Sequence, residues 1–238
     1  MKARCAMAVM FSVVFAAEVF AGDTNDPVRA AADGRALAQQ LLSLRPDASF
    51  TNTGKLIIRA PKQKRREVDY VCRVVVTATN WTSFYSAKQN TNALLGYSVE
   101  HRDGAANIYR DDGQTLLTPT QTFAAFAGSD FSLADLGLEF LHWPNQRVLK
   151  WEMKRSFGCN VLESKNPETQ AGGYSRIVSW IHQETGGLIQ AEAYDARGKK
   201  LKEFRPTEVE KVNGRQELKE MEIENVQTDS RTTLIFNL

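Results

Sequence analysis

The chain has 238 residues, of which 42% are hydrophobic and 24% charged, and its formal net charge is +2. This length and composition suit a globular protein with one sizeable core, or two. A net charge so close to zero gives no strong electrostatic signature of a protein that binds nucleic acid or an anionic membrane.

The N-terminus has the features of a targeting segment. Two basic residues precede an apolar stretch over residues 6–17, which is too short to span a bilayer. Val19-Phe20-Ala21 matches a cleavage site with small residues at the −3 and −1 positions. We therefore expect a signal peptide over residues 1–21 and a single domain over residues 22–238, placed outside the cytoplasm. No later stretch is long and apolar enough to predict a transmembrane helix.

The first predicted element of the mature chain is a helix. Asp26-Pro27 is a good start, because an aspartate accepts hydrogen bonds from free amides and proline is tolerated at the first helical position. Pro46 predicts its end. Apolar residues recur between them on one helical face: Ala30, Leu37, Leu41 and Leu44.

Beyond Pro46 the hydrophobic period changes to two, which predicts β-strands. Turn pairs such as Asp103-Gly104 and Asn213-Gly214 separate the runs at roughly ten-residue spacing, as in an antiparallel meander. One face of the strands is apolar and the other charged, which predicts a single curled sheet with one face in water. The alternating runs are Leu56 and Ile58; Tyr70, Cys72, Val74 and Val76; Leu149, Trp151 and Met153; Met221 and Ile223; and Thr232, Leu234 and Phe236.

One short apolar helix interrupts the strands in the middle of the chain. Ser132 is a good N-cap, and Asp135 three residues later completes a capping box. Pro144 predicts the end of this helix, and Leu133, Leu136 and Phe140 form its apolar stripe. Such a helix either plugs one end of the core or acts as a movable lid over an apolar cavity. Asp130 is expected to accept hydrogen bonds from turn amides and hold the hinge.

Several short motifs, in this order, resemble bacterial outer-membrane lipoprotein-sorting proteins, relatives of the periplasmic carriers LolA and LolB. The stretch 128–136 resembles their GSDFSxxDL signature, and four further motifs lie at 158–163, 174–186, 193–199 and 231–234. The resemblance implies an open half-barrel of about eleven antiparallel strands, mainly β, whose helices cover a hydrophobic cavity. It also implies a periplasmic protein that binds acyl chains of lipids or lipoproteins, works with inner- or outer-membrane transport components, and catalyses no reaction.

On this basis we assign roles to individual residues. The predicted wall of the cavity consists of Leu56, Ile58, Val74, Val76, Trp151 and Met153. The predicted lid consists of Phe131, Leu133, Leu136 and Phe140, with Asp130 and Ser132 as its hinge. Ordinary core packing is the alternative for each apolar residue, because buried apolar side chains are the norm.

The remaining chemistry-bearing residues give few signals. Cys72 and Cys159 could form a disulfide in an oxidising compartment, or stay as two buried thiols. The histidines are isolated and no phosphate-binding glycine loop is present, so we expect no metal, no cofactor and no catalytic residue. Two hypotheses remain: a monomeric lipid or lipoprotein carrier, or an envelope sensory or interaction module of the same fold with a protein partner. A hollow cavity would favour the first, and a filled interior with an exposed apolar patch the second.

Overall fold

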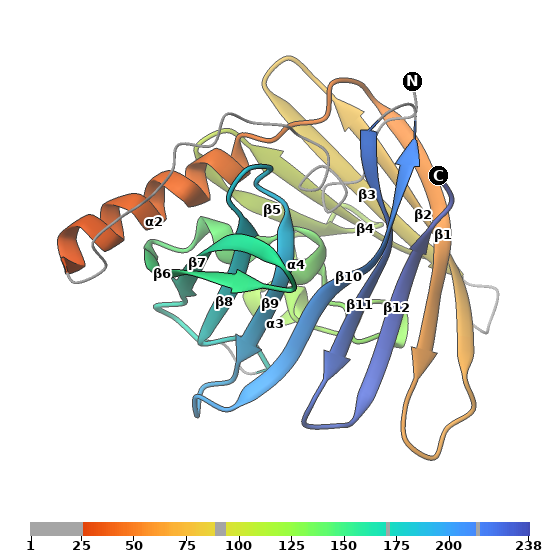
Figure 1. Ribbon diagram of the computed structural model, residues 1–238. Helices are drawn as coiled ribbons and strands as arrows, with labels where there is room; N and C mark the ends of the chain where they lie inside the picture. Colours follow the sequence, from red (N-terminus) through yellow and green to blue (C-terminus); the bar gives the residue numbers. More distant parts are fainter. Residues whose placement is uncertain (1–25, 89–93, 170–171, 213–214) are drawn as a thin grey trace.

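A computed structural model describes residues 26–88, 94–169, 172–212 and 215–238. The predicted signal peptide over residues 1–21 lies outside these ranges. A curled sheet dominates the fold, and short helices lie on its concave side (Figure 1). The helices of the described chain are α2 (Pro27–Leu42), α3 (Pro119–Thr122), η1 (Phe126–Gly128), α4 (Leu133–Leu136) and η2 (Glu139–His142).

All strands of the described residues belong to one 12-stranded antiparallel sheet, so the predicted mainly-β fold is confirmed with one strand more than expected. The strands are β1 (Phe50–Arg59), β2 (Arg66–Val76), β3 (Asn80–Lys88), β4 (Leu94–Arg102), β5 (Ala105–Asp111), β6 (Asn145–Lys154), β7 (Phe157–Lys165), β8 (Arg176–His182), β9 (Leu188–Tyr194), β10 (Lys200–Val212), β11 (Arg215–Asn225) and β12 (Ser230–Phe236).

The strand order explains why the sheet stays open. It runs β5-β4-β3-β2-β1-β12-β11-β10-β9-β8-β7-β6, so consecutive strands pair everywhere except between β5 and β6, and β1 pairs with β12. β5 and β6 follow one another in the chain, yet they form the two opposite edges of the sheet. We call the unpaired side between these edges the seam. The segment 112–144, which connects them, contains all the short helices after α2.

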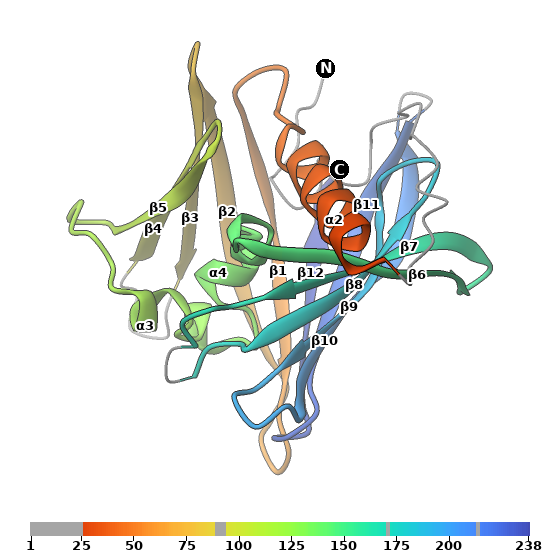
Figure 2. The ribbon, with the colours of Figure 1, turned by 90° about the vertical axis from the view of Figure 1, so that its left-hand side faces the viewer.

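Helix α2 packs against the edge strand β6 (Figure 2). Asp26 caps it as predicted, since its side chain accepts hydrogen bonds from the amides of Val28 and Arg29. The helix ends at Leu42, before Pro46. At Gly34 the two elements approach so closely that a Cβ atom would lie 2.3 Å from the Cα of Arg147. This contact requires a glycine.

The mid-chain helix is shorter than predicted. The Ser132–Asp135 capping box is present, but α4 ends after one turn. Leu138 then adopts a left-handed backbone conformation with φ of 51°, and a separate 3-10 turn, η2, follows. The break lies beside Gly137, where a Cβ would lie 2.4 Å from the hydroxyl of Tyr109. The single helix expected up to Pro144 is therefore wrong, because contact with β5 bends the chain there.

The two cysteines lie in different apolar clusters. Cys72 belongs to the main core on the concave face, whereas Cys159 belongs to a smaller cluster that also contains Val161 and Trp180. Successive residues of a strand point to opposite faces, so Cys159 and Val161 lie on the other side of β7 from the core residue Leu162. Cys72 and Cys159 do not form a disulfide with one another, which corrects that possibility.

Candidate functional site

A buried polar network fixes α4 to the sheet. Asp135, only 4% exposed, is its centre. Its carboxylate accepts hydrogen bonds from the amide and the hydroxyl of Ser132, both at 2.8 Å, and from the hydroxyl of Tyr174 at 2.7 Å. The ammonium group of Lys202 on β10 lies 3.3 Å away and supplies a positive charge. We call Ser132, Asp135, Tyr174 and Lys202 the Asp135 network.

Asp130 ties the same segment to the last strand. Its carboxylate accepts hydrogen bonds from the hydroxyls of Ser230 and Thr232, the latter at 2.7 Å, and its carbonyl accepts one from Lys202 at 2.6 Å. The sequence predicted hydrogen bonds from turn amides to this carboxylate. The partners found are instead side chains of β12, about a hundred residues further along the chain.

The four residues predicted as a lid lie inside the main core. The exposed fractions are 0% for Phe131, 2% for Leu133, 3% for Leu136 and 6% for Phe140. Exposing one such side chain costs about 1.5–3 kcal/mol, so lifting all four would cost roughly 6–12 kcal/mol. This range is similar to the total stability of an ordinary domain, about 5–15 kcal/mol. Lifting the segment 131–140 as one piece would therefore cost about as much as unfolding an ordinary domain.

The six residues predicted as a cavity wall do not come together. Leu56, Ile58 and Val74 are buried in the core, and Val76 lies partly buried at its margin. Trp151 and Met153 are 51% and 57% exposed, so this part of the prediction is wrong. A β-bulge between Val148 and Lys150 shifts the alternation of β6, and both side chains lie on an edge strand beyond the main core.

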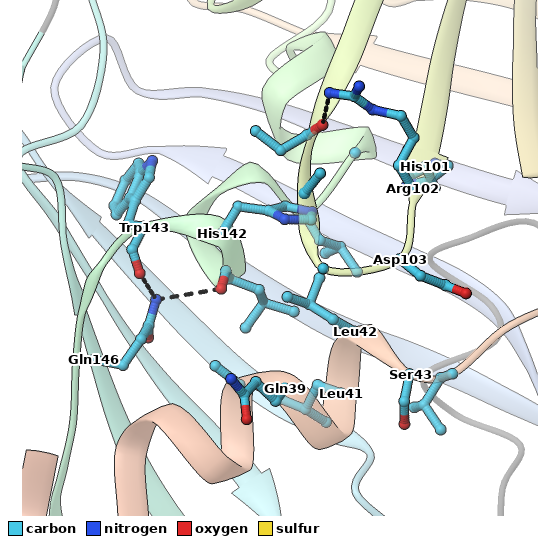
Figure 3. Close-up of a pocket in the computed structure, with 18 of the residues that line it drawn as sticks. Gln39, Leu41, Leu42, Ser43, His101, Arg102, Asp103, His142, Trp143 and Gln146 are labelled. Atoms are coloured by element: carbon cyan, nitrogen blue, oxygen red, sulfur yellow. Dashed lines mark hydrogen bonds between the residues drawn. The ribbon is translucent and has the colours of Figure 1, made fainter. Parts of the chain in front are cut away.

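A cavity of about 490 Å³ lies instead at the seam. The end of α2, the β4–β5 turn and the chain between α4 and β6 surround it, as Figure 3 shows. Its apolar lining includes Leu41, Leu42, Trp81, Leu138, Leu141 and Trp143. Both its volume and its lining are those of a small-molecule pocket, which typically encloses 300–1,000 Å³.

Gln146 holds one wall of this cavity in place. Its side-chain amide donates hydrogen bonds to the carbonyls of Phe140 and Trp143 at 2.9 Å, and it accepts one from Ser164 at 2.6 Å. Figure 3 shows the bond to Trp143. Gln146 thereby joins the end of η2 to the edge strand β6. It is a polar residue in a strand without any motif, so the sequence carried no signal for this role.

Two histidines, the buried His101 and the partly buried His142, are among the polar residues that line the cavity. His101 stacks on Trp81, its cross-strand partner, with ring centroids 3.6 Å apart. The pKa of His101 is lowered to about 3, mainly by burial and also by the charge of His142, while the side chain of Asn107 acts in the opposite direction. Burial lowers the pKa of His142 to about 4. Both rings are thus neutral near pH 7, and their Nε2 atoms have no hydrogen-bond partner within the described chain.

A second cavity, of about 390 Å³, lies beside the first along the seam. Tyr109 and Glu139 line it, and the tyrosine hydroxyl donates a hydrogen bond to the carboxylate at 2.8 Å. Burial raises the pKa of Glu139, and hydrogen bonds from Tyr109 and Asn107 oppose this shift. His142 and Trp143 line both cavities and separate them.

The described residues offer no obvious catalytic centre. They contain no cluster of three or more histidine, cysteine, aspartate or glutamate side chains able to hold a metal ion. The site that the structure does offer is a hollow whose lining combines apolar side chains, two neutral imidazoles and the charged residues Arg35, Arg102 and Asp103, which suits binding of an apolar ligand with a polar end. His101 and His142 are 41 positions apart in the sequence, so no motif spacing marks them as a pair.

A family model described as an uncharacterized protein matches residues 93–237. The chain belongs to that family. No curated protein matches the chain in sequence.

Three solved structures share the fold of this chain. A putative outer-membrane lipoprotein-sorting protein domain from Vibrio parahaemolyticus is 17% identical with a TM-score of 0.72, over 87% of this chain and 92% of that one. A DUF1329 family protein from Desulfovibrio piger is 19% identical with a TM-score of 0.68, over 87% and 91%. A LolA superfamily protein from Nitrosomonas europaea is 16% identical with a TM-score of 0.62, over 86% and 91%. The LolA-like fold predicted from the motifs is confirmed.

Proposed function

We propose that this protein is a periplasmic carrier that shelters acyl chains of lipids or lipoproteins on their way to the outer membrane. The cavity at the seam is the observation that carries the proposal, because its lining is mostly apolar and it lies at the open side of the half-barrel. Each methylene removed from water contributes about 0.8 kcal/mol. A cavity that takes up an acyl chain thus removes most of the penalty of carrying it through water.

The likeness to a lipoprotein-sorting domain and a LolA superfamily protein supports this function over catalysis. We propose that the protein is not an enzyme, that it needs no cofactor, and that it works as a monomer with membrane transport components as partners. Among the described residues, no helix has the length and hydropathy needed to cross a membrane. The predicted signal peptide supports export to the periplasm.

We further propose that α4 is a fixed wall and that the ligand enters beside it. The Asp135 network and the burial of the four predicted lid residues support this arrangement, since lifting them would cost roughly 6–12 kcal/mol. Leu42 and Leu138 are better candidates for a moving gate. Both line the cavity and are only partly buried, so a change of rotamer can open it at a small cost.

Uptake of a fluorescent fatty-acid probe by the purified mature protein tests the carrier function. Leu42→Glu and Leu138→Glu each place a charge at the cavity and are expected to weaken probe binding about tenfold or more, because a charged group disfavours an apolar ligand there. Leu94→Glu is the matched control. Leu94 is 61% exposed and does not line either cavity, so this variant should bind like the native protein.

Native mass spectrometry of protein purified from its own periplasm identifies the cargo. Acylated peptide or phospholipid bound to native protein and lost from Leu138→Glu is the expected result. Probe binding that is absent, or equal in all variants, would refute the carrier function at this cavity.

The filled centre of the half-barrel favours a second candidate, a sensory or interaction module with a protein partner. Phe131, Leu56 and Val74, for example, are at most 1% exposed and belong to one continuous core. Such a module would bind no probe and would retain a protein partner from the envelope. The same two measurements therefore separate the candidates.

A further inference from the structure

The hairpin formed by β6 and β7 exposes unusually large apolar side chains. Trp151, Met153 and Phe157 are 51%, 57% and 45% exposed, although they lie within seven consecutive residues. The other tryptophans, in contrast, are each 7–8% exposed. Clustered exposed apolar side chains usually mark a surface that binds something.

The three side chains surround the tip of the hairpin. Trp151 and Met153 are two residues apart and share one face of the strand. Phe157 pairs with Lys154, whereas Met153 pairs with Gly158, so the phenylalanine lies on the opposite face. Figure 2 shows this hairpin extending to the right, past the N-terminal end of α2. The tip thus presents apolar groups on both sides of a single thin element.

The exposed side chains are held in place. The indole nitrogen of Trp151 donates a hydrogen bond to the side-chain oxygen of Gln183 at 3.2 Å, and the ring of Phe157 meets that of His182 edge-on at 5.1 Å. A two-residue turn, Arg155 and Ser156, closes the hairpin with φ of 50° and 68°. Such preorganised side chains lose little conformational entropy on binding.

Positive charge accompanies this apolar tip. Lys150 pairs with Glu152 at 2.6 Å and is thereby neutralised. Lys154 lies 4.1 Å from the centre of the Trp180 ring, and neither it nor Arg155 forms an ion pair in the described chain. Lys154 also interacts electrostatically with the carboxylates of Glu152 and Glu203, and Glu184 in the neighbouring β8–β9 turn is exposed. Within the turn itself, residues 154–157, the only charged side chains are the two cations Lys154 and Arg155.

We propose that the tip of the β6–β7 hairpin docks on the surface of an anionic phospholipid bilayer. Tryptophan and other large apolar side chains favour the boundary between headgroups and acyl chains. Lys154 and Arg155 then lie at the level of the lipid phosphates, where each cation is attracted to the anionic headgroups. This docking goes beyond the carrier function, because it concerns a surface that lines neither cavity.

Co-sedimentation with phosphatidylglycerol-containing vesicles measures the docking. Trp151→Ser/Met153→Ser is expected to lower the partition coefficient about tenfold, and Lys154→Gln/Arg155→Gln about tenfold on these vesicles but not on pure phosphatidylcholine. Val209→Ser/Val226→Ser is the matched control. These two valines are 44% and 39% exposed and lie outside the hairpin, so their removal should leave binding unchanged.

Quenching by brominated phosphatidylglycerol shows which residue inserts. Trp151 is expected to dominate the quenching, which Trp151→Phe should then abolish, because the other tryptophans are buried. Equal binding by native protein and Trp151→Ser/Met153→Ser, or no vesicle binding by either, would overturn the proposal. A native protein that instead forms dimers lost in the same variant would also overturn it. Uptake of the fatty-acid probe by all these variants is measured in parallel, so a failure of docking is distinguished from a failure of the carrier function.

Discussion

Tyr174→Phe tests whether the Asp135 network holds α4 against the sheet. The tyrosine is 2% exposed, and its hydroxyl donates a 2.7 Å hydrogen bond to the buried carboxylate of Asp135. A hydrogen bond to a charged group contributes about 1.5–3 kcal/mol. The variant should therefore lose about that much free energy of unfolding, which lowers the thermal midpoint by roughly 3–12 °C in a chain of this size.

Tyr194→Phe is the matched control for this prediction. Its hydroxyl also donates a 2.7 Å hydrogen bond to a carboxylate, that of Glu192, but the ring is only partly buried. Water replaces the lost partner there, so the expected loss is at most about 1 kcal/mol. Urea denaturation with an unchanged slope gives both values. Equal losses in the two variants would refute the argument that burial makes the Asp135 network strong.

Two further predictions concern the cavity and α2. The folded-state pKa values of His101 and His142, about 3 and 4, lie below the ordinary value of 6.5, so the unfolded chain binds protons first as the pH falls. The free energy of unfolding should therefore be highest above pH 6.5 and fall below it, by about 2 kcal/mol per histidine at pH 5. In urea titrations, the fall should be smaller for His101→Phe/His142→Phe. Gly34→Ala should lower the thermal midpoint, because its Cβ would overlap the backbone of Arg147. Helix propensity alone predicts that Gly34→Ala gains about 1 kcal/mol in free energy of unfolding. A raised thermal midpoint would therefore contradict the close approach of α2 and β6.

Features that depend on nearby residues were predictable. The Asp26-Pro27 start of α2 and the Ser132–Asp135 capping box both involve groups at most three positions apart. Local backbone geometry decides such contacts, so sequence spacing is sufficient to recognise them. The partners of the same residues were not predictable. Tyr174 is 39 positions from Asp135 and Thr232 is 102 positions from Asp130, and only the folded sheet brings them together.

The incorrect part of the predicted cavity wall also has a cause that only the folded sheet decides. The alternation of Leu149, Trp151 and Met153 predicted one apolar face, but a bulge in β6 places Leu149 against the smaller cluster and leaves the other two exposed. A one-residue shift moves a strand's side chains to the other face. No sequence pattern marks that bulge, because it depends on how β6 pairs with β7.

The sequence by itself determined the mainly β character and the positions of the two helical regions, because period, turns and caps act over a few residues. The LolA-like open sheet was implied by the resemblance of short motifs to a known family. Tertiary structure alone decided where the hollow lies. The pairing of β1 with β12 makes β5 and β6 opposite edges, and the seam between them brings the end of α2, the β4–β5 turn and the chain after α4 around one cavity. Its histidines acquire their lowered pKa values only there, since burial requires the assembled walls.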